Sequence, residues 1–239
     1  MGGISHKGRR LTKLILFVTL FYLGGACMAI GGTRPRHIVL IGASVGKAWN
    51  ISELPKRMKN SSYSFEYVGS YQFDKSSALN EILSRSKNKP DAIILKECAA
   101  YFPSDVSFEV AKSLMKQWVN WCQAKNIVPI PTTVAPVTPS NDERFKTHNP
   151  LKRIIKRMLG ISMKTRIERI VEYNEWVRTF CKEKNLIVLD LEIALRIDDG
   201  NRFLRDDLTK GDGLHLNAEG YRILDSIVIP TLDRVRFPK

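Results

Sequence analysis

Two short segments at opposite ends of the 239-residue sequence hold residue types that together activate a serine. In the first, Ser44 follows an apolar run that ends at Gly42, so it lies in a tight turn where a strand would end. In the second, Asp212 and His215 stand three residues apart, just before the last helical pattern. A serine hydroxyl is a weak nucleophile until a base removes its proton, and a histidine base needs an acid that fixes its tautomer. The three residues therefore predict a nucleophilic serine with an acid–base partner.

His215 is the best placed of the four histidines to act as that base. His6 lies in a basic N-terminal segment, His37 at the start of the first apolar run, and His148 in an irregular stretch. Taken alone, each segment also has a plain structural interpretation, since serine is common in turns and histidine can precede a helix. The combination of both segments favours the catalytic interpretation.

Short apolar runs alternate with helical patterns along the chain, as in a parallel sheet covered by helices on both faces. The runs typical of strands are His37–Gly42, Ser64–Val68, Ala92–Leu95, Ile127–Thr133 and Leu186–Asp190. The helical patterns are Lys75–Ser86, Phe108–Ala124, Arg166–Glu183 and Ala218–Val235. Asn217, before the last pattern, is a residue type favoured at helix N-caps. Prolines in the fourth run predict an edge position or an irregular end there.

The two chemical segments resemble sequence blocks of the SGNH/GDSL-type serine hydrolases. His37–Ser44 is similar to the first block, with Gly-Ala-Ser in place of the commoner Gly-Asp-Ser, and Asp212–Tyr221 (DGLHLNAEGY) is similar to the last. The resemblance spans roughly 36–235. It implies an α/β fold, a flavodoxin-like three-layer α/β/α sandwich with a parallel sheet of about five strands. It also implies hydrolysis or transfer of acyl groups, with no metal and no cofactor.

The resemblance assigns roles residue by residue. It implies that Ser44 is the nucleophile, His215 the general base and Asp212 the acid that orients the base. Gly69, which follows the second strand in the context Val-Gly-Ser, matches the glycine whose N–H joins that of Ser44 in the oxyanion hole.

The segment Lys96–Tyr101 (KECAAY) departs from the third block of the family. The family has an asparagine there that supplies a third oxyanion donor, and counting without gaps puts Ala100 at that position and Cys98 at the preceding glycine. Loss of one such donor typically lowers the rate ~10²–10³-fold. The lysine, the tyrosine and the backbone N–H groups of this segment are the candidate replacements.

Glu97, Cys98 and Ala100 are accordingly predicted as candidate site-lining residues. For Glu97 the alternative is a structural acid held in an ion pair. Cys98, Cys122 and Cys181 show no close spacing, and their odd number argues against a disulfide framework, so we expect buried thiols.

Residues 1–32 have the pattern of a targeting segment. Basic residues precede the apolar run Leu14–Ile30, which is nearly long enough to span a bilayer. A cleaved export signal, an uncleaved membrane anchor and, because Cys27 follows small residues, a lipidated precursor all remain open. We therefore predict an exported protein, periplasmic or membrane-anchored, whose hydrolase-like domain occupies 33–239.

The net charge of +14 favours acidic partners, among them an anionic membrane surface. Nucleic acid is an unlikely partner, because the chain has no aromatic–basic RNA motif and no zinc-finger spacing. Residues 136–160 are predicted to form an irregular basic insertion. Within it, Pro150–Leu159 has the pattern of an amphipathic basic helix, either solvated and packed on the domain, or facing a membrane or covering the site.

These features predict an exported serine esterase or deacylase acting on an acyl ester of an envelope glycan or lipid. Two alternatives remain open at this point. An O-acyltransferase would use the same three residues and deliver the acyl group to a sugar hydroxyl. A catalytically inactive binding protein would keep only the scaffold, and the altered third segment favours it.

Overall fold

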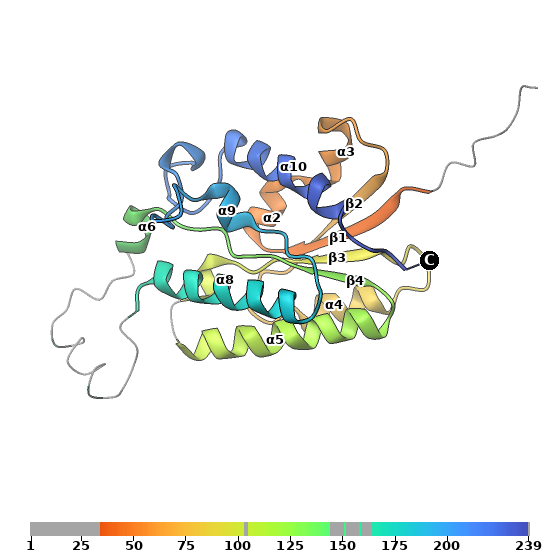
Figure 1. Cartoon of the computed structure of the whole chain (residues 1–239), viewed down its shortest axis with the longest axis horizontal. Helices are drawn as coiled ribbons and strands as arrows, with labels where there is room; N and C mark the ends of the chain where they lie inside the picture. Colours follow the sequence, from red (N-terminus) through yellow and green to blue (C-terminus); the bar gives the residue numbers. More distant parts are fainter. Residues whose placement is uncertain (1–33, 103–104, 144–150, 152–157, 159–163, 239) are drawn as a thin grey trace, which may run out of the picture. The chain divides into compact units, whose positions relative to one another are not determined.

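The structure is a computed structural model that describes residues 34–102, 105–143, 151, 158 and 164–238. All of these except Arg34 belong to one compact unit, Pro35–Lys239, built on a parallel sheet (Figure 1). The strand order is β2-β1-β3-β4, with bounds Tyr63–Gly69, Arg36–Gly42, Ala92–Leu95 and Val128–Pro131 in that order. Gly42 pairs with Gly69, and Ile41 pairs with Leu95, so the carboxyl ends of these strands lie at one edge. The predicted α/β fold with a parallel sheet is confirmed.

The fifth predicted strand, Leu186–Asp190, lies beside β4 but makes only an isolated parallel bridge between Thr132 and Leu189. The reason is the proline content of β4. Val128 donates its amide to Asp91, just before β3, and Thr132 donates to Leu95 of β3, so the amides of the alternate positions face the fifth segment. Two of those positions are Pro129 and Pro131, which have no N–H to donate. Thr133 does donate to the Leu189 carbonyl, at 3.2 Å, and the ladder ends there.

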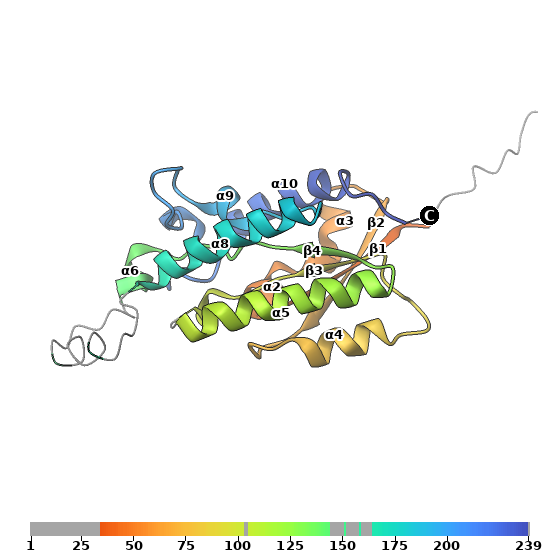
Figure 2. The same ribbon diagram turned by 60° about the horizontal axis from the view of Figure 1, so that its bottom comes forward.

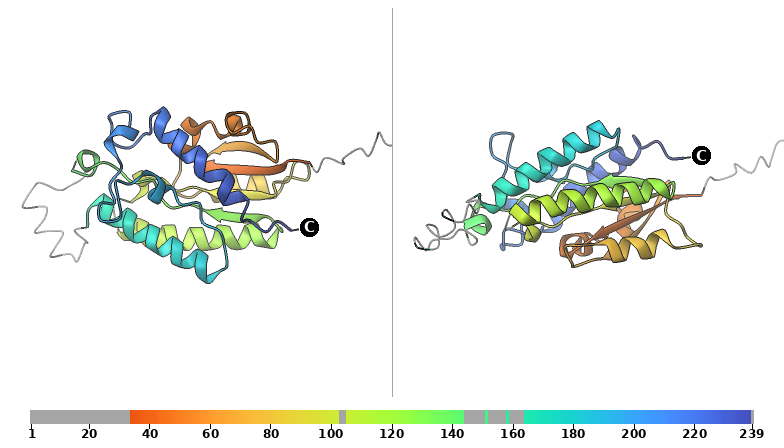
Figure 3. Two further views of the ribbon diagram at one scale, coloured as in Figure 1. Left: turned by 45° about the horizontal axis from the view of Figure 1, so that its top comes forward. Right: turned by 90° about the horizontal axis from the view of Figure 1, so that it is seen from below.

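Helices cover both faces of the sheet, as Figures 1 and 2 show. On one face Ile38 and Leu40 of β1 pack in a core with side chains of α2, α3, α9 and α10. On the other face Val39 and Ile41 pack with those of α4, α5 and α8. The helices of the first face are α2 (Ser44–Trp49), α3 (Leu54–Arg57), α9 (Leu191–Leu195) and α10 (Ala218–Leu232). Those of the second are α4 (Ser76–Leu83), α5 (Asp105–Ala124) and α8 (Arg166–Glu183), with α5 between the other two (Figure 3).

The helix bounds follow from local chemistry. α8 begins at a capping box in which Thr165 and Glu168 each bond the backbone of the other, and it matches the predicted range. α10 begins where Asn217 accepts a hydrogen bond from the Gly220 amide, as predicted. α4 is shorter than its predicted pattern. An Asx turn, in which Asp74 accepts a hydrogen bond from the Ser76 amide, precedes the helix, and Ser84 is its C-cap.

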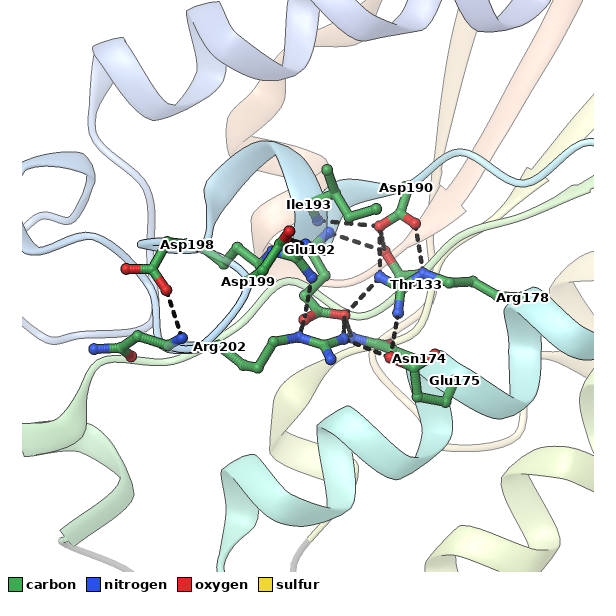
Figure 4. Close-up of polar contacts among 12 residues, drawn as sticks. Thr133, Asn174, Glu175, Arg178, Asp190, Glu192, Ile193, Asp198, Asp199 and Arg202 are labelled. Carbon is green, nitrogen blue, oxygen red and sulfur yellow. Dashed lines mark hydrogen bonds and ion pairs between the residues drawn. The ribbon is translucent and has the colours of Figure 1, made fainter.

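A buried ionic network joins α8, α9 and the segment that follows β4 (Figure 4). Glu192 is fully buried and accepts hydrogen bonds from Arg178, Arg202 and Asn174. The Asn174 amide also bonds both backbone groups of Val134, at 2.7 and 3.0 Å. The network therefore fixes the path of the chain as it leaves β4 toward α6 (Pro139–Glu143).

Two predictions concern segments that lie wholly or mostly outside the described residues. The targeting segment 1–32 lies outside the described residues, as does most of Pro150–Leu159. Of the part of the chain that the structure describes, no helix is long and apolar enough to cross a membrane. Cys98, Cys122 and Cys181 are buried free thiols.

We predict that Glu192→Gln lowers the free energy of unfolding by about 3 kcal/mol, because it removes the fully buried carboxylate that pairs with the partly buried Arg178 and Arg202. Burial raises the pKa of Glu192, but the bonds from Arg202 and Arg178 outweigh it and the net shift is downward. Its stabilisation is therefore present above the ordinary carboxyl pKa and is lost as the pH falls below it. Measured by urea unfolding, the free energy of unfolding of the variant should therefore fall less with decreasing pH than that of the parental protein.

The matched control is Glu219→Gln, which removes an equally charged side chain from an exposed pair with Arg222. It should leave the urea midpoint essentially unchanged. Equal losses in both variants would show that the network does not stabilise the fold.

Candidate active site

Ser44 is the first residue of α2 and follows the last residue of β1 by two positions. The sheet register brings Gly69, the last residue of β2, level with Gly42. The backbone of Ser44 and that of Gly69 thus lie at the same edge of the sheet, where the carboxyl ends of parallel strands form a site. Their predicted role as oxyanion donors stays a prediction.

Tyr67 anchors the turn that carries Ser44. Its hydroxyl donates to the carbonyl oxygens of Gly42 at 2.9 Å and Ala43 at 3.2 Å. Its ring lies so close to α2 that a Cβ on Gly46 would be 3.2 Å from a ring carbon. Burial raises the pKa of Tyr67, and a hydrogen bond with Tyr71 raises it further, so the phenol stays protonated and can donate. Sequence reasoning missed this residue, because its role depends on the pairing of β1 with β2.

Ser44, His215 and Asp212 form a continuous relay of hydrogen bonds. The Ser44 Oγ lies 2.9 Å from His215 Nε2, and His215 Nδ1 lies 2.5 Å from Asp212 Oδ2. The side chains of His215 and Asp212 are partly exposed, at 34% and 43%, so the relay can be reached from solvent. The structure therefore brings together the three residues that the sequence singled out, across 171 positions of the chain.

The Asp212 carboxylate is held in its charged form. Burial raises its pKa, but hydrogen bonds from the His215 ring and from the Leu214 and His215 amides outweigh this and lower it to about 2. The two amides donate to Oδ1 at 2.9 and 2.8 Å, which leaves Oδ2 for the ring. An ionised Asp212 favours the histidine tautomer with its proton on Nδ1, and that tautomer presents an unprotonated Nε2 to Ser44.

The turn that carries Asp212 is braced from both sides. Thr209 accepts hydrogen bonds from the amides of Gly211 and Gly213, at 3.0 and 3.1 Å. From the segment after β4, Thr138 donates its amide to the Gly213 carbonyl at 3.0 Å, and Asn141 donates its side-chain amide to the Asp212 carbonyl at 2.9 Å. Two separate parts of the chain thus hold the acid in place.

Gly213 is the tightest point of this turn. It adopts a φ of +73°, and a Cβ there would lie 2.0 Å from Thr138 Oγ1. Only glycine fits both conditions. Gly211, two residues earlier, also has a positive φ of +92° but has nothing within 4 Å of its Cβ position.

Residues 136–142 differ from the expected loop. Pro136, Val137 and Thr138 are buried, and so are Asn141 and Asp142. Asp142 accepts a hydrogen bond from the Ile167 amide at the start of α8. This first part of the predicted insertion is therefore a packed support of the site. A polar, proline-containing stretch gives no local signal for that, because its partners lie far along the chain.

The segment Lys96–Tyr101, which departs from the family's third block, places its side chains on two faces of the sheet. Glu97 is fully buried and pairs with Lys75 at 2.7 Å, and the Lys75 ammonium lies over the rings of Tyr101 and Trp118. Burial raises the pKa of Glu97, although Lys75 acts in the opposite direction. The buried pair with Lys75 supports a structural role for Glu97, the alternative that the sequence left open for this acid.

Lys96 is the candidate donor that lies beside the nucleophile turn. Its Cδ is 3.5 Å from the position that a Cβ on Gly42 would occupy, and its Nζ donates to the Glu97 carbonyl at 3.1 Å. Burial lowers its pKa. Cys98 is buried and Ala100 is exposed, and the methyl group of an alanine cannot donate a hydrogen bond. Ala100 therefore supplies no side-chain replacement for the missing asparagine.

Comparisons with known proteins agree with this fold. No family model matches the chain, and no curated protein matches it by sequence. Among solved structures, a GDSL-like lipase from Bacteroides thetaiotaomicron VPI-5482 is similar with a TM-score of 0.60, at 16% identity over 85% of this chain and 93% of that one. A lipase/acylhydrolase from Enterococcus faecalis is similar with a TM-score of 0.55, at 17% identity over 85% of this chain and 99% of that one.

The chain therefore has the fold of the SGNH/GDSL-type hydrolases, as the sequence resemblance implied. At this level of identity the likeness establishes the fold and not the activity.

We predict that Gly213→Ala slows the reaction of Ser44 with a fluorophosphonate, which labels activated serines, by about a hundredfold. The added methyl must displace Thr138 or the Asp212 turn, and a shift of about 1 Å in a reacting group is enough for such a loss. The measurement is the labelling rate, with thermal melting as a check on folding.

Gly211→Ala is the control, because it carries the same backbone strain without the collision. It should keep most of the labelling rate. Similar rates in the two variants would show that contact with Thr138 does not position the acid.

Proposed function

We propose that the protein is a serine hydrolase that cleaves acyl esters through Ser44, His215 and Asp212. The observation that carries the proposal is the relay itself, with 2.9 Å from Ser44 Oγ to His215 Nε2 and 2.5 Å from Nδ1 to Asp212. These distances are within the reach needed for direct proton transfer.

In the proposed reaction, Ser44 Oγ attacks the ester carbonyl carbon while its proton passes to His215 Nε2. The carbonyl oxygen becomes an oxyanion, for which the N–H groups of Ser44 and Gly69 are the proposed donors. Collapse of the tetrahedral intermediate breaks the ester C–O bond, and the leaving alcohol takes the proton from His215. Water then repeats the sequence on the acyl-enzyme, releasing the acid and restoring Ser44.

We further propose that the substrate is an acyl ester of an envelope glycan or lipid and that the protein works outside the cytoplasm, periplasmic or attached to a membrane. The basic and apolar pattern of residues 1–32 supports this placement. The neighbours named above are a lipase and a lipase/acylhydrolase, which supports an ester substrate.

The test is hydrolysis of an aryl acetate by the full chain, alongside the variants Ser44→Ala and Asp212→Asn. Ser44→Ala should abolish turnover, and Asp212→Asn should lower it at least about a hundredfold without unfolding the protein. Asp212, with its pKa of about 2, stays ionised above about pH 4 and adds no ionisation step of its own to the pH dependence of the rate there.

Ser226→Ala is the matched control, because this exposed serine lies on α10 and donates its hydroxyl to the Ile223 carbonyl. It should keep the parental rate. Turnover that survives Ser44→Ala would overturn the proposal, and absence of turnover and of fluorophosphonate labelling in the parent would support an inactive binding protein. Loss of acyl groups to an added sugar, in place of water, would identify an acyltransferase.

A further inference from the structure

The edge of the sheet opposite Ser44 is formed by turns that lead from helices into strands. Four of these turns contain a lysine followed by an asparagine: Lys59-Asn60, Lys87-Asn88, Lys125-Asn126 and Lys184-Asn185. The first three precede β2, β3 and β4, and the fourth precedes the segment beside β4. Because the strands are parallel, all four turns lie at the same edge.

All four lysines are exposed, and so are Lys89, Arg234 and Arg236. We call these seven side chains the basic edge. Helix ends favour a basic residue and a left-handed residue, and here Lys59, Asn126 and Asn185 are left-handed two residues after a helix. This preference does not account for Lys87, Lys89 and Arg236, which lie four or more residues beyond the preceding helix.

Few acids offset this charge. Among the described residues of these turns, Asp91 accepts hydrogen bonds from the Arg36 guanidinium and the His37 amide, and Asp233 accepts one from the Tyr63 hydroxyl. Glu183, at the end of α8, is the further acid and is exposed. The basic edge therefore presents a strong positive field to solvent.

A hollow of about 590 Å³ lies at the same edge of the sheet as these seven side chains. It is lined by Arg234, Arg236, Asn126 and Asn185, together with apolar side chains. The C-terminal segment that supplies the arginines is tied to β1, because the Arg36 guanidinium lies 5.0 Å from the centre of the Phe237 ring. Figure 1 shows the C-terminus near the start of β1. Donors and charge around a partly apolar hollow suit a phosphate-bearing headgroup.

The chain enters the domain at this same edge. Arg34 is the first described residue, and β1 begins at Arg36. The apolar run predicted to insert in a membrane ends at Ile30. The five residues between Ile30 and Arg36 span at most about 17 Å when fully extended. If the run inserts, its tether therefore allows the basic edge to reach the bilayer surface.

We propose that the basic edge rests on the anionic headgroups of a bilayer, so that Ser44 faces the aqueous compartment. The proposal relies on the membrane placement suggested above and not on hydrolase activity. Each basic side chain near an anionic surface strengthens attachment roughly fivefold. An ester site at the far end of the sheet then reaches glycan-borne esters in that compartment more readily than the acyl chains of the supporting leaflet.

The test is a lysine acylation footprint of the full chain on vesicles, read by mass spectrometry with a water-soluble reagent. One set of vesicles is phosphatidylcholine, and the other contains phosphatidylglycerol as well. On the anionic vesicles the reaction rates of Lys87, Lys89, Lys125 and Lys184 should fall at least about fivefold, and high salt should restore them. Lys47 and Lys116, which are exposed elsewhere on the domain, are internal controls and should react equally on both.

A variant with these four edge lysines changed to glutamine gives a second readout. Trypsin cleavage after Arg236 should be slowed by anionic vesicles in the parent and restored in the variant, while aryl acetate turnover stays the same in both. Equal reactivity of the edge lysines on the two vesicle types would overturn the proposal. Protection of Lys152 and Lys156 in their place would also overturn it, and would put Pro150–Leu159 on the membrane.

Discussion

The contact between the Gly213 turn and Thr138 is the constraint on which the candidate site depends. It brings a segment that leaves β4 against a loop that precedes α10, at a point with no room for a Cβ. The same turn carries Asp212, whose carboxylate receives two amides and the His215 ring. The ring direction, and with it the distance to Ser44, follows from how this turn is held. A serine hydroxyl by itself would be inert.

The support of this turn extends through the domain. The Val134 backbone is bonded by Asn174 of α8, and Asn174 also bonds Glu192 of the buried ionic network (Figure 4). Further along, Asn141 accepts from Arg166 and donates to the Asp212 carbonyl. The nucleophile is held independently, by β1 and the Tyr67 hydroxyl. Two rigid parts thus meet between Ser44 and His215, which suits a reaction that depends on positioning.

The parts of this arrangement that were predicted from the sequence are those with a local signal. Asp212 and His215 are close in sequence, and Ser44 follows a recognisable strand, so their types and spacing sufficed. Thr138 and Asn141 had no such signal, because they act on a turn about seventy residues away. The fifth strand was only partly predictable, since the prolines of β4 limit the pairing of its neighbour. Likewise, each lysine of the basic edge is ordinary in its own turn, and only the parallel topology gathers them.

The central claim is that Asp212 holds His215 with its proton on Nδ1, so that Nε2 can accept the proton of Ser44. Nitrogen NMR of the selectively labelled histidines, at a pH where His215 is neutral, tests this most directly. The account predicts a protonated Nδ1 and an unprotonated Nε2 for His215, with loss of this preference in Asp212→Asn. A neutral ring that carries its proton on Nε2 in the parental protein would contradict it, because such a ring cannot act as the base for Ser44.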